Sequence, residues 1–218
     1  MGALLSTCLL SNLSVLLSSC RTLAIIALLA STLACSNSHT SGSAAPGAEP
    51  LLVAAASDLA SMEQSLAQAF RTATGKQFEM VFAASGMLAR QIEQGAPFDV
   101  YLSANEEYVK QLVERGKLDP ATVSVYAIGR LGLWSKEGAI NDLKQLTAGR
   151  VKHIAIANPA HAPYGMAARE ALQTSGLWDQ LQPRLVYGEN VRQALQFAES
   201  GNADVALTAW SLVFDRGG

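Results

Sequence analysis

The chain has 218 residues, of which 50% are hydrophobic and 16% are charged, with a formal net charge of −2. This length allows one sizeable core or two small lobes, and the lack of a basic excess excludes the electrostatic footprint of a nucleic-acid-binding protein. The cysteines, Cys8, Cys20 and Cys35, all lie near the N-terminus. A disulfide framework or a thiolate metal site is therefore excluded from the rest of the chain.

The N-terminal region has the pattern of an export signal. Arg21 is followed by an apolar run over residues 22–34 and then by Cys35. A positive charge, a short apolar run and small residues are typical of a secretory signal, and the run is short for a membrane span. Residues 33–36 also resemble a bacterial lipobox, in which the cysteine becomes lipidated. We therefore expect residues 1–35 to be a lipoprotein signal peptide, with Cys35 as the site of lipidation.

Two alternatives for this region stay open, namely ordinary cleavage after Ala34 and a permanent anchor helix.

The next segment, residues 36–50, is rich in Ser, Gly, Ala and Pro and has almost no apolar bulk. Such a composition cannot bury enough surface to fold, so a disordered linker is expected. The sequence thus predicts a protein that is exported to the periplasm and tethered to a membrane through Cys35.

From Leu51 onward, short apolar runs alternate with segments of helical periodicity. Strands are expected at residues 51–56, 78–83, 98–102, 128–134, 154–157, 184–187 and 205–209. Helices are expected to follow residues 57–58, 85–86, 103–105, 163–165 and 189–191. Strands that alternate with helices of this length indicate an α/β fold with parallel strands.

Four of the strand-to-helix junctions share a chemistry suited to anions. They are Ser57-Asp58, Ser85-Gly86, Tyr164-Gly165 and Asn190-Val191. A helix N-terminus carries unpaired N–H donors and a partial positive charge, and ligands of open α/β sheets collect beyond the carboxyl ends of the strands. Four converging junctions would bind an anion without any Lys or Arg. The alternative is that Ser57, Asp58 and Ser85 only cap their helices.

Three motifs carry a resemblance to a known family. They are AAASDL at residues 54–59, ASGMLARQIEQGAPFDV at 84–100 followed by Ser103-Ala104, and GENVRQAL at 188–195. Together they resemble the periplasmic molybdate-binding proteins of ABC importers, over a stretch from about Leu51 to Val213. The resemblance implies a type II periplasmic-binding-protein fold, in which a ligand cleft lies between two α/β lobes.

The resemblance also implies a division of the chain. We expect the first lobe at residues 51–127, the second at 128–207, and a crossover back towards the first lobe at 208–218. Chains of the family normally continue for several tens of residues more, so we expect the first lobe to lack its usual cover. A nonfunctional truncated fragment therefore stays open as an alternative.

The family's ligand is a tetrahedral oxodianion, and its contacts carry over onto five residues. The resemblance implies that the hydroxyls of Ser57 and Ser85 donate to the anion, together with the backbone N–H groups of Asp58 and Val191. The carboxylate of Asp58 is expected to turn away. Tyr164 lies in the Pro-x-Gly turn and is expected to supply a phenol donor. Molybdenum would be held only through its oxygens, with no catalytic residue and no cofactor.

The expected function is capture of molybdate, and of tungstate as the next-preferred ligand, for delivery to an ABC-transporter permease in the inner membrane. We expect the protein to act as a monomer and not to bind nucleic acid. Another tetrahedral oxyanion such as sulfate is the nearest alternative ligand, because only its size differs.

Other chemistries find little support in the sequence. Ser57 does not lie in a G-x-S-x-G elbow, and neither a P-loop nor a dinucleotide-binding glycine pattern is present. His153 and His161 have no carboxylate at metal-ligand spacing. A hydrolase is the alternative from another functional class, but we expect the protein not to be an enzyme.

Overall fold

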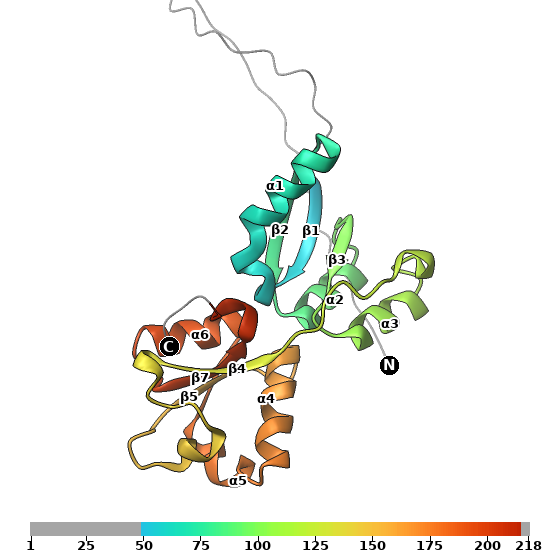
Figure 1. The fold of residues 1–218 in the computed structure, drawn as a ribbon. Coiled ribbons are helices and arrows are strands. Elements are labelled where there is room, and N and C mark those ends of the chain that lie inside the picture. Colours follow the sequence, from blue (N-terminus) through green and yellow to red (C-terminus); the bar gives the residue numbers. More distant parts are fainter. Residues whose placement is uncertain (1–48, 215–218) are drawn as a thin grey trace, which may run out of the picture. The chain divides into compact units, whose positions relative to one another are not determined.

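The computed structural model describes residues 49–214, apart from the side chain of Glu137. The predicted signal peptide, most of the linker and Cys35 lie outside the described residues. The described part contains two sheets, with strand orders β2-β1-β3 and β4-β7-β5-β6 (Figure 1). The strands are β1 (Leu51–Ala56), β2 (Phe78–Ala83), β3 (Val100–Leu102), β4 (Leu131–Ser135), β5 (Ile154–Ala157), β6 (Leu185–Gly188) and β7 (Val205–Ala209).

The helices follow the strands in the predicted alternation, with one exception. They are α1 (Glu63–Thr74), α2 (Ser85–Glu93), α3 (Glu106–Glu114), α4 (Pro163–Thr174), α5 (Trp178–Leu181) and α6 (Val191–Glu199). The exception is α5, which follows α4 and was not predicted. Two short 3-10 helices matter for the site, η1 (Ser57–Met62) and η6 (Trp210–Leu212). None of the helices in the described part of the chain is long and apolar enough to cross a membrane.

The first sheet is parallel throughout, and β1 lies at its centre. Successive side chains of a strand point to opposite faces, so β1 contributes to two clusters. Ala54 packs with Leu88 of α2 and Leu112 of α3, whereas Val53 and Ala55 pack in the cluster on the other face. The centre of this sheet is therefore apolar on both sides, as a continuous hydrophobic run predicts.

The second sheet is also covered on both faces, by α6 on one and α4 on the other (Figure 1). The two faces carry different kinds of side chain. Ile154 and Ile156 pack in one cluster with Ala168 and Leu172 of α4. The intervening alanines of β5 pack in the other cluster with α6. Small residues on this face allow α6 to lie close to the sheet, which brings its first turn near the ends of the strands.

One strand runs against the prediction of parallel pairing. β4 pairs with β7 in the antiparallel sense, with Trp134 opposite Ala206. The strand therefore closes one edge of an otherwise parallel sheet, in which β5 pairs in parallel with β6 and β7. An antiparallel edge strand on a parallel sheet is common in α/β proteins, and local sequence does not specify strand direction.

The remaining differences are at element boundaries. The segment after β1 begins as the 3-10 helix η1 before α1 starts at Glu63. β3 is shorter than expected and begins at Val100, and just before it the carboxylate of Asp99 accepts from the N–H of Leu52 at 2.8 Å. β4 starts at Leu131 rather than at residue 128, and β7 continues to Ala209, two residues past the expected end of the second lobe. The division into lobes remains a prediction.

Candidate functional site

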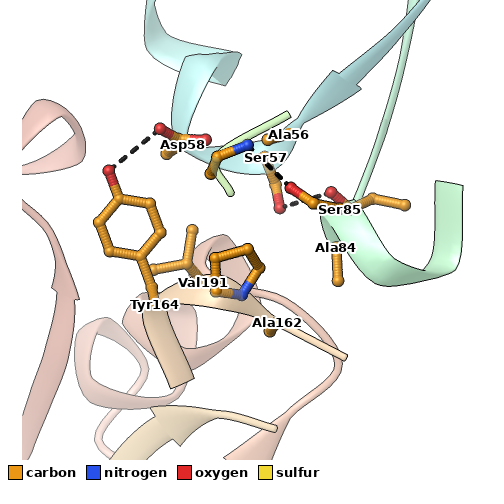
Figure 2. Close-up of a pocket in the computed structure, with 11 residues that line it drawn as sticks. Ala56, Ser57, Asp58, Ala84, Ser85, Ala162, Tyr164 and Val191 are labelled. Carbon is orange, nitrogen blue, oxygen red and sulfur yellow. Dashed lines mark hydrogen bonds between the residues drawn. The ribbon is translucent and has the colours of Figure 1, made fainter. Parts of the chain in front are cut away.

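Residues from all four junctions line one small cavity (Figure 2). Its volume is about 10 Å³, room for about one water molecule. The lining residues lie at or beyond the ends of strands of both sheets, and they are Ala56, Ser57, Asp58, Ala83, Ala84, Ser85, Ala104, Ala162, Pro163, Tyr164 and Val191. All five residues that the sequence singled out for oxyanion binding are therefore brought together.

The cavity forms where strands end and helices begin. Ser57 follows β1 directly, and Ser85 opens α2 just beyond β2. Tyr164 lies in the first turn of α4 after β5, and Val191 opens α6 after β6. Because the carboxyl ends of parallel strands meet at one edge of a sheet, each pair of junctions is gathered by its own sheet.

The two serines do not act as helix caps. Ala84, not Ser85, occupies the N-cap position of α2, and neither α2 nor η1 has a side-chain capping hydrogen bond. The hydroxyl of Ser85 accepts from the N–H of Ala104 at 3.0 Å, which leaves its own hydrogen free to donate. The hydroxyl of Ser57 donates to the carbonyl of Ala83 at 3.2 Å. The capping alternative is therefore wrong for both hydroxyls.

The first turn of α6 offers a backbone donor. Asn190 caps this helix, and its side-chain oxygen accepts from the N–H groups of Arg192 and Gln193, each at 3.0 Å. The N–H of Val191 comes before these two and has no intrahelical acceptor. Thr208 of β7 donates to the carbonyl of Val191 at 3.3 Å and so anchors this turn to the sheet.

The side chains of Asp58 and Tyr164 meet in the cavity. The phenol of Tyr164 donates to Oδ2 of Asp58 at 3.1 Å, a contact between the two sets of junctions (Figure 2). The carboxylate of Asp58 therefore faces the phenol, rather than turning away as expected. Burial raises the pKa of Asp58, and the Tyr164 hydrogen bond opposes that rise. Burial and the nearby Asp58 charge raise the pKa of Tyr164, which keeps the phenol protonated as a donor.

Two glycines, Gly129 and Gly86, shape this site through the space that their missing side chains leave. A Cβ at Gly129 would lie 2.5 Å from the phenol oxygen of Tyr164, so only a glycine lets the phenol take this position. At Gly86 a Cβ would lie 2.7 Å from the carbonyl oxygen of His161, to which the N–H of Gly86 donates at 3.0 Å. Gly86 belongs to a junction motif, but nothing near Gly129 in the sequence signals its role.

The cavity is polar without being basic. Within the described part of the chain, neither Lys nor Arg lines it, and no cluster of His, Cys, Asp and Glu could hold a metal ion. His161 places ring Nε2 3.0 Å from the carbonyl oxygen of Glu189, while the backbone N–H of His153 donates to Asp204. The arrangement can offer hydroxyl and backbone donors to a small anion, and one carboxylate faces them.

Comparisons with known proteins identify the family of this chain. The family described as bacterial extracellular solute-binding protein matches residues 51–218. The molybdate-binding protein ModA of Rhodobacter capsulatus is 38% identical over 179 residues, which cover 81% of this chain and 71% of the relative.

Solved structures give the same result. The periplasmic molybdate-binding protein of Azotobacter vinelandii superposes with a TM-score of 0.70 and 36% identity, covering 73% of this chain and 71% of that one. The substrate-binding domain of a putative molybdenum ABC transporter from Clostridium difficile gives a TM-score of 0.57 and 30% identity, covering 77% and 74%. The matched folds are of the two-lobe periplasmic-binding-protein class. The chain belongs to the family of bacterial extracellular solute-binding proteins.

Proposed function

We propose that this protein captures molybdate, and tungstate with it, outside the cytoplasm and delivers it to the permease of an ABC importer. One observation carries the proposal: the residues at four helix starts line a single cavity that offers uncharged donors. The sequence similarity to molybdate-binding proteins supports the same ligand.

The donor set suits a fully deprotonated tetrahedral anion. The hydroxyls of Ser57 and Ser85, the phenol of Tyr164 and the N–H groups of Asp58 and Val191 would each contact an oxygen, and none would ligate molybdenum itself. A hydrogen bond to a charged group contributes about 1.5–3 kcal/mol. Five such bonds contribute roughly 8–15 kcal/mol, against an association cost of about 4–15 kcal/mol. A sub-micromolar affinity is therefore within reach without a buried Arg.

Binding requires the cavity to expand. A tetrahedral oxoanion has five heavy atoms, whereas the cavity has room for about one water molecule. Two of the lining side chains are joined by the 3.1 Å hydrogen bond from Tyr164 to Asp58. We infer that the anion enters by separating these two side chains, after which the phenol donates to the anion.

The N-terminal region determines where the protein acts. We infer that the protein is exported to the periplasm, that Cys35 is lipidated, and that residues 36–50 tether the folded part to the membrane. Mass spectrometry of the mature N-terminus tests this. A diacylated Cys35 is the expected result, and a chain that starts after Cys35 would contradict the anchor.

Titration calorimetry with molybdate, tungstate, sulfate and phosphate tests the ligand. We expect sub-micromolar binding of molybdate and tungstate and much weaker binding of sulfate. Tight binding of phosphate without a molybdate signal would overturn the proposal. A Ser85→Ala variant that binds molybdate as tightly as the parent would show that the anion occupies another place.

A further inference from the structure

The acidic side chain of the cavity has an unusual environment. Among the described lining residues Asp58 is the acidic one, and the residue is only 8% exposed. Its Oδ2 accepts from Tyr164, but its Oδ1 is buried without a hydrogen-bond partner in the described part of the chain. Burying a carboxylate with an unsatisfied oxygen costs free energy, so this arrangement needs an explanation beyond stability.

No cation offsets the charge of Asp58 within residues 49–214. The influences on its carboxyl are burial, the Tyr164 hydroxyl and its own backbone N–H. Tyr126 lies in the segment before β4, and burial, together with the nearby Asp58 charge, raises the pKa of its phenol. From η6, Ser211 donates to the backbone carbonyl of Asp58 at 2.9 Å and not to the carboxylate. Arg192, in the first turn of α6, is exposed.

In this position, Asp58 disfavours a bound dianion in two ways. A phenol has one hydrogen to donate, so Tyr164 cannot serve Asp58 and an anion at the same time. A carboxylate that loses this donor is left facing the anion with the same sign of charge, in a site from which water is largely excluded. Like charges in such a site repel more strongly than in water.

We propose that Asp58 is a specificity-determining residue whose carboxylate limits how tightly the site holds a dianion, by competing for the Tyr164 phenol and by opposing negative charge. The inference rests on the proposed function, because it assumes that the cavity takes an oxoanion. A residue of this kind suits an importer, since the bound anion must also be released to the permease. It also makes the site respond to ligand charge as well as to ligand size.

The experiment compares the parent protein with Asp58→Asn by titration calorimetry at about pH 8. Asparagine keeps the shape and can still accept from Tyr164, but it removes the charge and adds a donor. We expect Asp58→Asn to bind molybdate at least about tenfold more tightly, and to gain less for perrhenate, a tetrahedral monoanion. Asp99→Asn is the matched control, because this exposed carboxylate bonds the N–H of Leu52 outside the cavity and its loss leaves molybdate affinity unchanged.

The outcomes separate the two proposals. If the folded parent protein does not bind molybdate at all, the proposed function fails. If the parent binds molybdate and Asp58→Asn binds it equally or more weakly, the role of Asp58 is refuted and the function stands. An equal gain for perrhenate and molybdate would refute the charge argument. Should thermal melting show that Asp58→Asn does not fold, Asp58→Ala removes the same charge and is judged by the same affinities.

Discussion

Replacing Tyr164 by Phe tests the centre of the site with a single atom. The ring stays in place and only the hydroxyl is lost, from a residue that is 8% exposed. Water therefore has little access to replace the missing donor. Losing a hydrogen bond to a charged group costs about 1.5–3 kcal/mol. Because the phenol must first give up its bond to Asp58, we expect the lower part of this range, a loss of roughly tenfold in molybdate affinity.

The same substitution has a second effect that does not involve the ligand. In the structure the phenol donates to Asp58 at 3.1 Å, and Oδ1 of that carboxylate already has no partner among the described residues. Removing the hydroxyl leaves a buried carboxylate without a side-chain donor, at a cost of about 1–3 kcal/mol. For a chain of this size, each kcal/mol lowers Tm by about 2–4 °C. Tyr164→Phe is therefore expected to weaken binding and to lower Tm.

Titration calorimetry with molybdate and thermal denaturation without it measure the two effects separately. Tyr126→Phe is the control, because its hydroxyl donates to the carbonyl of Ser103 at 3.1 Å and does not line the cavity. Thr208→Val is the counter-test, since Thr208 bonds the carbonyl of Val191 without lining the cavity. If Tyr164→Phe binds molybdate as well as the parent while Thr208→Val does not, the reasoning about the phenol is refuted.

Three further predictions concern neighbouring residues. Ser85→Ala should weaken molybdate binding more than Ser57→Ala, because the Ser57 hydroxyl must first give up its bond to a carbonyl, and equal losses by calorimetry would contradict this. Gly129→Ala should lower molybdate affinity by about tenfold or more by displacing the phenol, whereas Gly149→Ala, with open space around its Cβ, should not. Burial raises the pKa of Asp58 in the folded protein, so stability falls as pH rises through that pKa. Asp58→Asn should therefore raise Tm by a few degrees at pH 7 and little near pH 4. An equal rise in Tm at both pH values would contradict a raised pKa of Asp58.

Local sequence was sufficient to predict most of the fold. The strands at residues 51–56, 78–83, 154–157 and 205–209 lie where the apolar runs indicated. Apolar periodicity and glycine stops are properties of neighbouring residues, so they can be read without knowledge of distant contacts. For the same reason the strand-to-helix junctions could be located, and a helix start implies free donors wherever it lies.

Tertiary structure decided how those junctions are used. Asp58 and Tyr164 are separated by 106 positions in the chain, and no local pattern predicts that their side chains meet. The position of Gly129 beside the phenol and the antiparallel pairing of β4 depend equally on packing between distant segments. The sequence by itself determined which groups could donate to an anion. Which way the one carboxylate of the site faces was decided only by folding, because side-chain direction in a cavity depends on what the rest of the chain packs against it.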